Sequence, residues 1–117
     1  MDQSQTPVLD ALAAYHDQAF TPFTPPGHKQ GRGTDARTLA VLGQAVFASD
    51  VLATSGLDDR TSSGRVLERA QELMAEAVHA HHTFFTTCGS SLSVKSAMLS
   101  VAGPHEKLVV SRDAHKS

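Results

Sequence analysis

The sequence predicts an α/β fold in which an incomplete parallel or mixed sheet is flanked by helices. In its second half, helical periodicity alternates with short runs of β-branched and aromatic residues, in the order helix, strand, helix, strand. This alternation is typical of parallel strands joined by helical crossovers. Because two strands do not form a stable parallel sheet alone, we expect them to open a larger α/β domain.

Composition excludes several classes of function. The chain has 117 residues, 40% of them hydrophobic, and a formal net charge of −2, which is not the charge of a nucleic-acid-binding surface. No apolar run approaches the roughly eighteen residues of a membrane-spanning helix, so we expect no membrane partner. Cys88 is the single cysteine, which rules out an intramolecular disulfide and favours the cytoplasm.

The first helix is predicted to run from Pro7 to about Phe20. Thr6 supplies a capping hydroxyl, Pro7 suits the first helical position, and apolar residues then recur at helical spacing. The stretch that follows, "TPFTPPGHKQGRG", is too rich in proline and glycine for regular structure. We therefore divide the chain into residues 1–33, an N-terminal helix with a Pro/Gly-rich segment, and residues 34–117, the first part of a truncated major domain.

Five further elements are predicted within residues 34–117. Thr34 is predicted to cap a short helix that Gly43 ends, whereas residues 46–51 give mixed signals and are interpreted mostly as loop. Ser63 is predicted to cap the clearest amphipathic helix, with Leu73 on its apolar face. "HTFFTT" (residues 82–87) and "KLVVS" (residues 107–111) are predicted buried strands, and a helix separates them.

The stretch Cys88-Gly89-Ser90-Ser91 lies where the first predicted strand gives way to a helix. The first backbone N–H groups of a helix lack internal partners, and the helix dipole makes that end positive, so such a turn can hold a phosphate. Serine is also common at helix starts without any ligand, so a simple cap is the alternative.

Other polar clusters give weaker signals. His-Lys pairs occur at His28-Lys29 and His115-Lys116, and a buried lysine can form a Schiff base with a carbonyl. The histidines of "HAHH" (residues 79–82) straddle a helix end, and we expect no metal site there. For Asp58-Asp59, a turn with a helix-capping aspartate is the simplest interpretation.

Four stretches, taken together and in order, resemble the start of the major domain of the Orn/Lys/Arg decarboxylase family. They are "PFTPPGHKQG", "SDVLATSGLDD", "AQELMAEAVHAHHTFFTTCGSS" and "SRDAHKS". The resemblance implies a pyridoxal 5'-phosphate enzyme of fold type I, the aspartate-aminotransferase fold. The chain departs from the usual pattern of that family at three positions. The family has asparagine where Cys88 and Asp113 stand, and it often has threonine where Ser90 stands.

The resemblance also assigns roles to individual residues. The phosphate-binding turn falls on Gly89, Ser90 and Ser91, and the histidine that stacks on the cofactor ring, the catalytic residue of this chain, falls on His115. The Schiff-base lysine belongs to a later His-Lys pair, so Lys116 is not expected to be the covalent site. The chain therefore resembles the N-terminal portion of a decarboxylase of ornithine, lysine or arginine, cut within its cofactor site and inactive alone.

The family forms homodimers or higher homo-oligomers, and its substrates are basic amino acids. Two other interpretations remain open from the residues. The chain could be a non-catalytic fragment that serves only as a binding or interaction module. Alternatively, it could be the N-terminal part of another fold-type-I enzyme, such as an aminotransferase or a lyase, that binds the cofactor in the same way.

Overall fold

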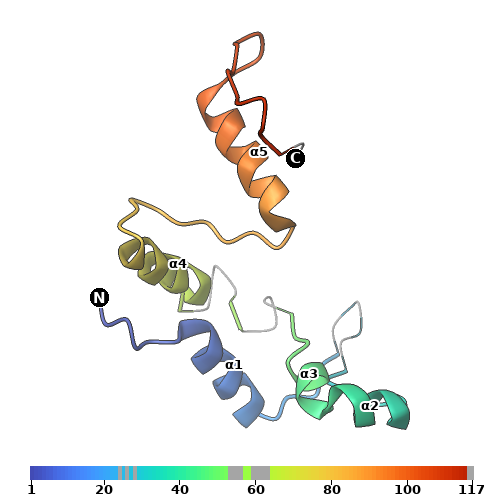
Figure 1. The fold of residues 1–117 in the computed structure, drawn as a ribbon. Helices are drawn as coiled ribbons and strands as arrows, with labels where there is room; N and C mark the ends of the chain where they lie inside the picture. Colours follow the sequence, from blue (N-terminus) through green and yellow to red (C-terminus); the bar gives the residue numbers. More distant parts are fainter. Residues whose placement is uncertain (24, 26, 28, 53–56, 59–63, 116–117) are drawn as a thin grey trace. The chain divides into compact units, whose positions relative to one another are not determined.

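The computed structural model describes residues 1–23, 25, 27, 29–52, 57–58 and 64–115. These residues form five α-helices (Figure 1) and divide into two compact units, residues 1–83 and residues 84–117. We call them the N-terminal unit and the C-terminal unit. Each is described by itself.

The predicted α/β fold is wrong for this chain: the part that the structure describes contains helices and no strand or sheet. Residues 82–87 and 107–111, the two predicted strands, lie without regular structure on either side of a helix. A strand is held by the hydrogen bonds of a neighbouring strand, and neither segment has such a neighbour among the described residues. Nor are the segments buried, since Phe84 is 81% exposed and Val109 is 94% exposed.

The core of the N-terminal unit lies where α1 (Pro7–Asp17) packs against α4 (Val66–Ala77). Its buried side chains are Tyr15, Leu73 and Ala75. The ring of Tyr15 also meets that of Phe20 edge-on, with 5.8 Å between centroids. The predicted first helix is therefore confirmed, although it ends at Asp17 rather than near Phe20.

The start of α1 differs from the predicted cap. Pro7 takes the first helical position, as expected, but the Thr6 side chain makes no capping bond. Its hydroxyl instead donates a hydrogen bond to the carboxylate of Asp10, at 2.8 Å. The start of α1 thus has Pro7 at the first helical position and a side-chain hydrogen bond between the preceding Thr6 and Asp10.

Two short helices follow the Pro/Gly-rich segment: α2 (Ala36–Leu42) and α3 (Gln44–Ala48). The cap of α2 is Asp35 rather than the predicted Thr34, because the Asp35 carboxylate accepts bonds from the backbone N–H groups of Arg37 and Thr38. Gly43 ends α2 with a positive φ of 78°, as the sequence predicts. The mixed signals of residues 46–51 resolve into the end of α3 and a turn at Ser49.

The start of α4 depends on a carboxylate that is distant in sequence. Arg65, the residue before the helix, has a left-handed backbone (φ 55°) and provides no side-chain cap. Asp58 takes that role: its two carboxylate oxygens accept from the backbone N–H groups of Val66, at 3.0 Å, and Leu67, at 3.2 Å. The prediction of a helix-capping aspartate is confirmed for Asp58, whereas Ser63, the predicted cap, and Asp59 lie outside the described residues.

Replacing Asp58 with alanine should loosen the first turn of α4. The change removes two acceptors and a negative charge from the helix N-terminus, which together stabilise a helix by about 1–2 kcal/mol. Amide hydrogen exchange should accelerate at Val66 and Leu67. Asp58→Asn keeps one acceptor oxygen and should show a smaller change; equal exchange in wild type and Asp58→Ala would contradict the cap.

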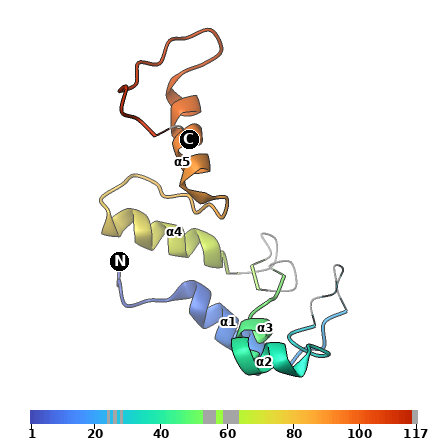
Figure 2. The same ribbon diagram turned by 45° about the vertical axis from the view of Figure 1, so that its right-hand side comes forward.

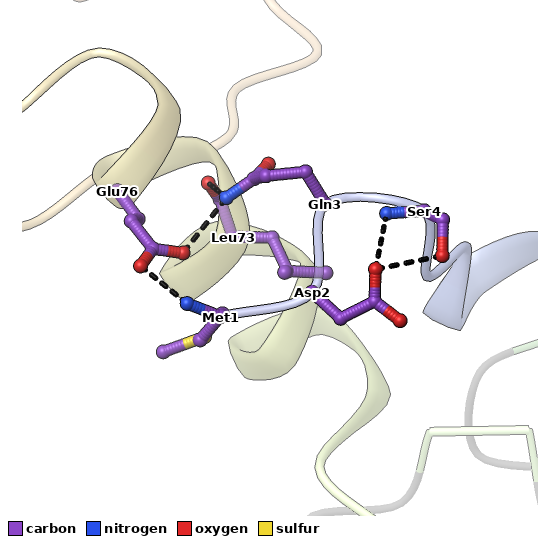
Figure 3. A network of polar contacts seen from close by, with 6 residues as sticks. All are labelled: Met1, Asp2, Gln3, Ser4, Leu73 and Glu76. Carbon is purple, nitrogen blue, oxygen red and sulfur yellow. Dashed lines mark hydrogen bonds and ion pairs between the residues drawn. The ribbon is translucent and has the colours of Figure 1, made fainter.

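A polar network ties the first residues of the chain to the last turns of α4 (Figure 3). The Gln3 side-chain amide donates to the Leu73 carbonyl and to the carboxylate of Glu76, at 3.3 and 2.8 Å, and the Met1 ammonium also pairs with Glu76. These bonds, that of the ammonium first and that of Gln3 second, lower the pKa of Glu76. The network therefore stabilises the unit above the ordinary pKa of a glutamate, and its contribution disappears as the pH falls through the lowered value.

The C-terminal unit contains one helix, α5 (Gly89–Val101). The helix predicted after the Cys88-Gly89 turn is therefore confirmed, and it ends just before Gly103. None of the unit's described side chains is buried, so the unit exposes much of its apolar surface. After α5 the chain reverses and runs back beside the helix, as Figures 1 and 2 both show. Within the described ranges, no helix is both long and apolar enough to cross a membrane.

Candidate functional site

The N-terminal end of α5 carries the predicted phosphate turn. The helix begins at Gly89, whose φ of +77° lies in the left-handed region that glycine adopts without strain. A Cβ atom built on Gly89 would meet nothing within 4 Å among the described atoms. No described atom therefore crowds the backbone at the Cβ position of Gly89.

Ser90 and Ser91 lie in the first turn of α5. Neither occupies the capping position, which is the residue before the helix. That residue is Cys88, whose side chain forms no capping hydrogen bond, while its own N–H donates to the Thr86 hydroxyl at 3.3 Å. Ser90 is exposed and Ser91 is half-buried. Because the first N–H groups of a helix have no intrahelical partner, this thirteen-residue helix presents donors and a positive dipole end beside two hydroxyls.

His115 lies in the same compact unit as α5, in the segment that follows the helix. A small turn precedes it, in which the N–H of Asp113 donates to the Ser111 hydroxyl, at 3.2 Å, and the N–H of Ala114 donates to the Ser111 carbonyl, at 3.1 Å. His115 itself is exposed. The structure thus places all four predicted site residues in one unit.

The other candidates are the His-Lys pairs and the histidines of residues 79–82. Lys116 and His28, one from each His-Lys pair, lie outside the described residues. The rings of His81 and His82 meet edge-on at 4.3 Å. Within the described chain, no three side chains of histidine, cysteine, aspartate or glutamate gather as a metal site would require.

The structure also contains a cavity that the sequence did not indicate. A cavity of about 310 Å³ opens between the Pro/Gly-rich segment and α3, and its charged lining residues are Lys29 and Arg32 from the segment and Asp50, which follows α3. The proline and glycine content of "TPFTPPGHKQGRG" predicted a stretch without regular structure there. It gave no sign that the loop would fold against a helix more than ten residues further on.

Comparison with known proteins defines the class of the chain. The family described as "Orn/Lys/Arg decarboxylase, major domain" matches residues 6–117. The chain belongs to this family. The resemblance inferred from the four sequence stretches is therefore confirmed.

The relatives that it matches include several bacterial proteins named arginine decarboxylase. The chain is 37% identical over 115 residues to one from Halalkalibacterium halodurans, 33% identical over 117 residues to one from Bacillus subtilis and 36% identical over 117 residues to one from Bacillus cereus. The matches cover 98%, 100% and 100% of this chain but 23%, 24% and 25% of the relatives. The chain thus spans about a quarter of their length, and no solved structure matches it.

The residues at the start of α5 fit the phosphate of pyridoxal 5'-phosphate. The left-handed corner at Gly89, the absence of a Cys88 side-chain cap in the described structure and the neighbouring hydroxyls suit a phosphate dianion. An asparagine is a strong cap, whereas a thiol is a weak hydrogen-bonding group. Cys88 therefore leaves the start of α5 without a side-chain cap in the described structure.

Proposed function

We propose that this chain forms the N-terminal part of a pyridoxal-phosphate-dependent decarboxylase of basic amino acids. The observation that carries the proposal is the open first turn of α5, with Gly89, Ser90 and Ser91, in a chain that belongs to the Orn/Lys/Arg decarboxylase family. Gly89 lets the backbone approach the phosphate. Ser90 and Ser91 add hydroxyl donors to the N–H groups of the helix.

The chemical work divides between the cofactor and the chain. When bound, pyridoxal phosphate acts as an electron sink that makes loss of the substrate's carboxylate possible. The first turn of α5 anchors the phosphate through N–H and hydroxyl donors. His115 offers a flat ring against which the cofactor can stack, which fixes its orientation. The residues proposed here therefore bind the cofactor and orient its ring. The lysine that binds the cofactor covalently in this family is not among them.

Arginine is the first substrate to test, because the relatives described above are named arginine decarboxylase. Lysine and ornithine are the other members of the substrate class. A homo-oligomeric assembly also belongs to the proposal, and it is supported by the large exposed apolar side chains of the chain, such as Phe84, Leu99 and Val109. A cytoplasmic location is supported by its one free, exposed cysteine, Cys88.

The activity is tested by measuring carbon dioxide release from arginine, lysine and ornithine by the full-length gene product, with and without added pyridoxal phosphate. We expect cofactor-dependent release from at least one of the three, and most from arginine. Transamination of these substrates without release of carbon dioxide would indicate an aminotransferase instead. Absence of both reactions would refute the proposal.

The phosphate site itself is tested with Ser90→Ala/Ser91→Ala. Hydrogen bonds to a charged group are each worth about 1.5–3 kcal/mol, so losing two hydroxyl donors should weaken binding roughly a hundredfold or more. The ligand should be 4'-deoxypyridoxine 5'-phosphate, which has no aldehyde to react with surface lysines. Its dissociation constant can be measured by calorimetry.

Ser93→Ala/Ser96→Ala provides the matched control, because both serines lie further along the same helix and are exposed. This variant should bind the ligand as the wild type does. Equal affinity in wild type and Ser90→Ala/Ser91→Ala would remove the phosphate assignment.

A further inference from the structure

The cavity between the Pro/Gly-rich segment and α3 is held in shape by a tightly bent loop. Within the loop, the N–H of Arg32 donates to the Lys29 carbonyl at 3.0 Å, and the N–H of Thr34 donates to the Gly31 carbonyl at 3.2 Å. Gln30 and Gly31 both have positive φ values, 53° and 87°. These two consecutive turns bring Lys29 and Arg32 to the same cavity.

The loop is also fixed to α3. The side-chain amide of Gln44 donates to the Gln30 carbonyl at 3.0 Å. A Cβ atom on Gly31 would lie 2.5 Å from Gln44 Nε2 and 3.0 Å from Phe47 Cβ, so only glycine permits this approach. The loop backbone is therefore pre-organised against the helix, which lowers the entropy lost when a ligand binds.

The described lining of the cavity has an excess of positive charge. Lys29 and Arg32 contribute two cations, and Asp50 contributes one carboxylate. One guanidinium nitrogen of Arg32 donates to the Thr21 hydroxyl at 3.3 Å, which positions the group and leaves other N–H donors for a ligand. Phe47 adds an apolar side to the cavity.

We propose that this cavity binds the carboxylate of a small organic acid, with Lys29 and Arg32 as its cationic partners. A guanidinium matches the planar geometry of a carboxylate, and a single negative charge matches the excess positive charge of the lining. Asp50 in the same lining disfavours a phosphate dianion. The site lies in the N-terminal unit and does not depend on the phosphate turn of α5.

The test is a titration of the ¹⁵N-labelled 117-residue chain with propionate at constant ionic strength, followed by NMR at the amides of Gly27, Gly31 and Gly33. We expect saturable shifts at these glycines with propionate. Propionamide, a neutral molecule of the same shape, should produce none. Equal shifts with propionamide or with sodium chloride, or tighter binding of inorganic phosphate than of propionate, would overturn the proposal.

Variants identify the side chains responsible. Lys29→Gln and Arg32→Gln should each raise the dissociation constant for propionate at least threefold, and the double variant should abolish saturation. Lys29→Arg keeps the charge and should retain binding. Arg37→Gln removes an exposed cation on α2 that pairs with Asp35 at 3.5 Å, outside the cavity lining, and should leave binding unchanged. Loss of binding in Arg37→Gln equal to that in Arg32→Gln would show only a general effect of net charge.

Discussion

Leu73→Ala is expected to separate α1 from α4. Leu73 is only 8% exposed and is one of the three buried hydrophobic side chains of the described chain. Truncating a buried leucine to alanine costs about 2–5 kcal/mol, from lost burial and from the cavity left behind. Because the core is so small, this loss should be comparable to the whole free energy that holds the two helices together.

Tyr15 offers a direct probe of this change. It is the only tyrosine of a chain that has no tryptophan, and its ring is 5% exposed within the α1–α4 core. The urea midpoint of Tyr15 fluorescence should fall sharply in Leu73→Ala. Leu99→Ala, which truncates a leucine that is 77% exposed in the C-terminal unit, should leave the midpoint unchanged. Equal midpoints in wild type and Leu73→Ala would contradict this view of the core.

Gly89→Val is expected to have a large effect on the proposed cofactor site. With φ at +77°, position 89 strains any L-residue, and a β-branched side chain suffers most. No described atom lies within 4 Å of the added Cβ, so the substitution causes no steric clash there. Its energetic cost comes from the strained backbone conformation alone. We expect at least a tenfold loss of affinity for 4'-deoxypyridoxine 5'-phosphate, because the backbone must rotate away from the phosphate-binding geometry.

Gly64→Val is the matched control for this substitution. Gly64 precedes α4, has no positive φ and also has open space around its Cβ position. Calorimetry should give this variant the affinity of the wild type. Comparable losses in Gly64→Val and Gly89→Val would mean that the ligand responds to general destabilisation rather than to the corner at Gly89.

The helices could be predicted from the sequence because their signals are local. Pro7 at a first position and Gly43 at an end act within one turn, and the structure confirms both. The strands at residues 82–87 and 107–111 could not be judged in this way, because β-branched and aromatic composition does not supply a pairing partner. Without a partner in the described chain, these segments form no strand.

The candidate site shows the same limit. Local sequence located the turn at Gly89, Ser90 and Ser91, and the family resemblance located His115. The sequence indicated a helix-capping aspartate at Asp58-Asp59 but assigned the cap of α4 to Ser63, because eight residues separate Asp58 from Val66, whose N–H donates to its carboxylate. The Lys29 and Arg32 cavity was missed for a similar reason: its second wall, α3, is remote in the sequence.

The distant cap at Asp58 bears on how the chain is made. A ribosome releases the N-terminal end first, so α1 and Asp58 have both left the exit tunnel before the amides of Val66 and Leu67 appear. The Asp58 carboxylate is therefore outside the tunnel when the first turn of α4 emerges, and α1 is available to pack against α4. The paired helices can thus assemble during translation, before α5 has left the exit tunnel, which matches the tendency of nascent proteins to acquire structure from the N-terminus onward.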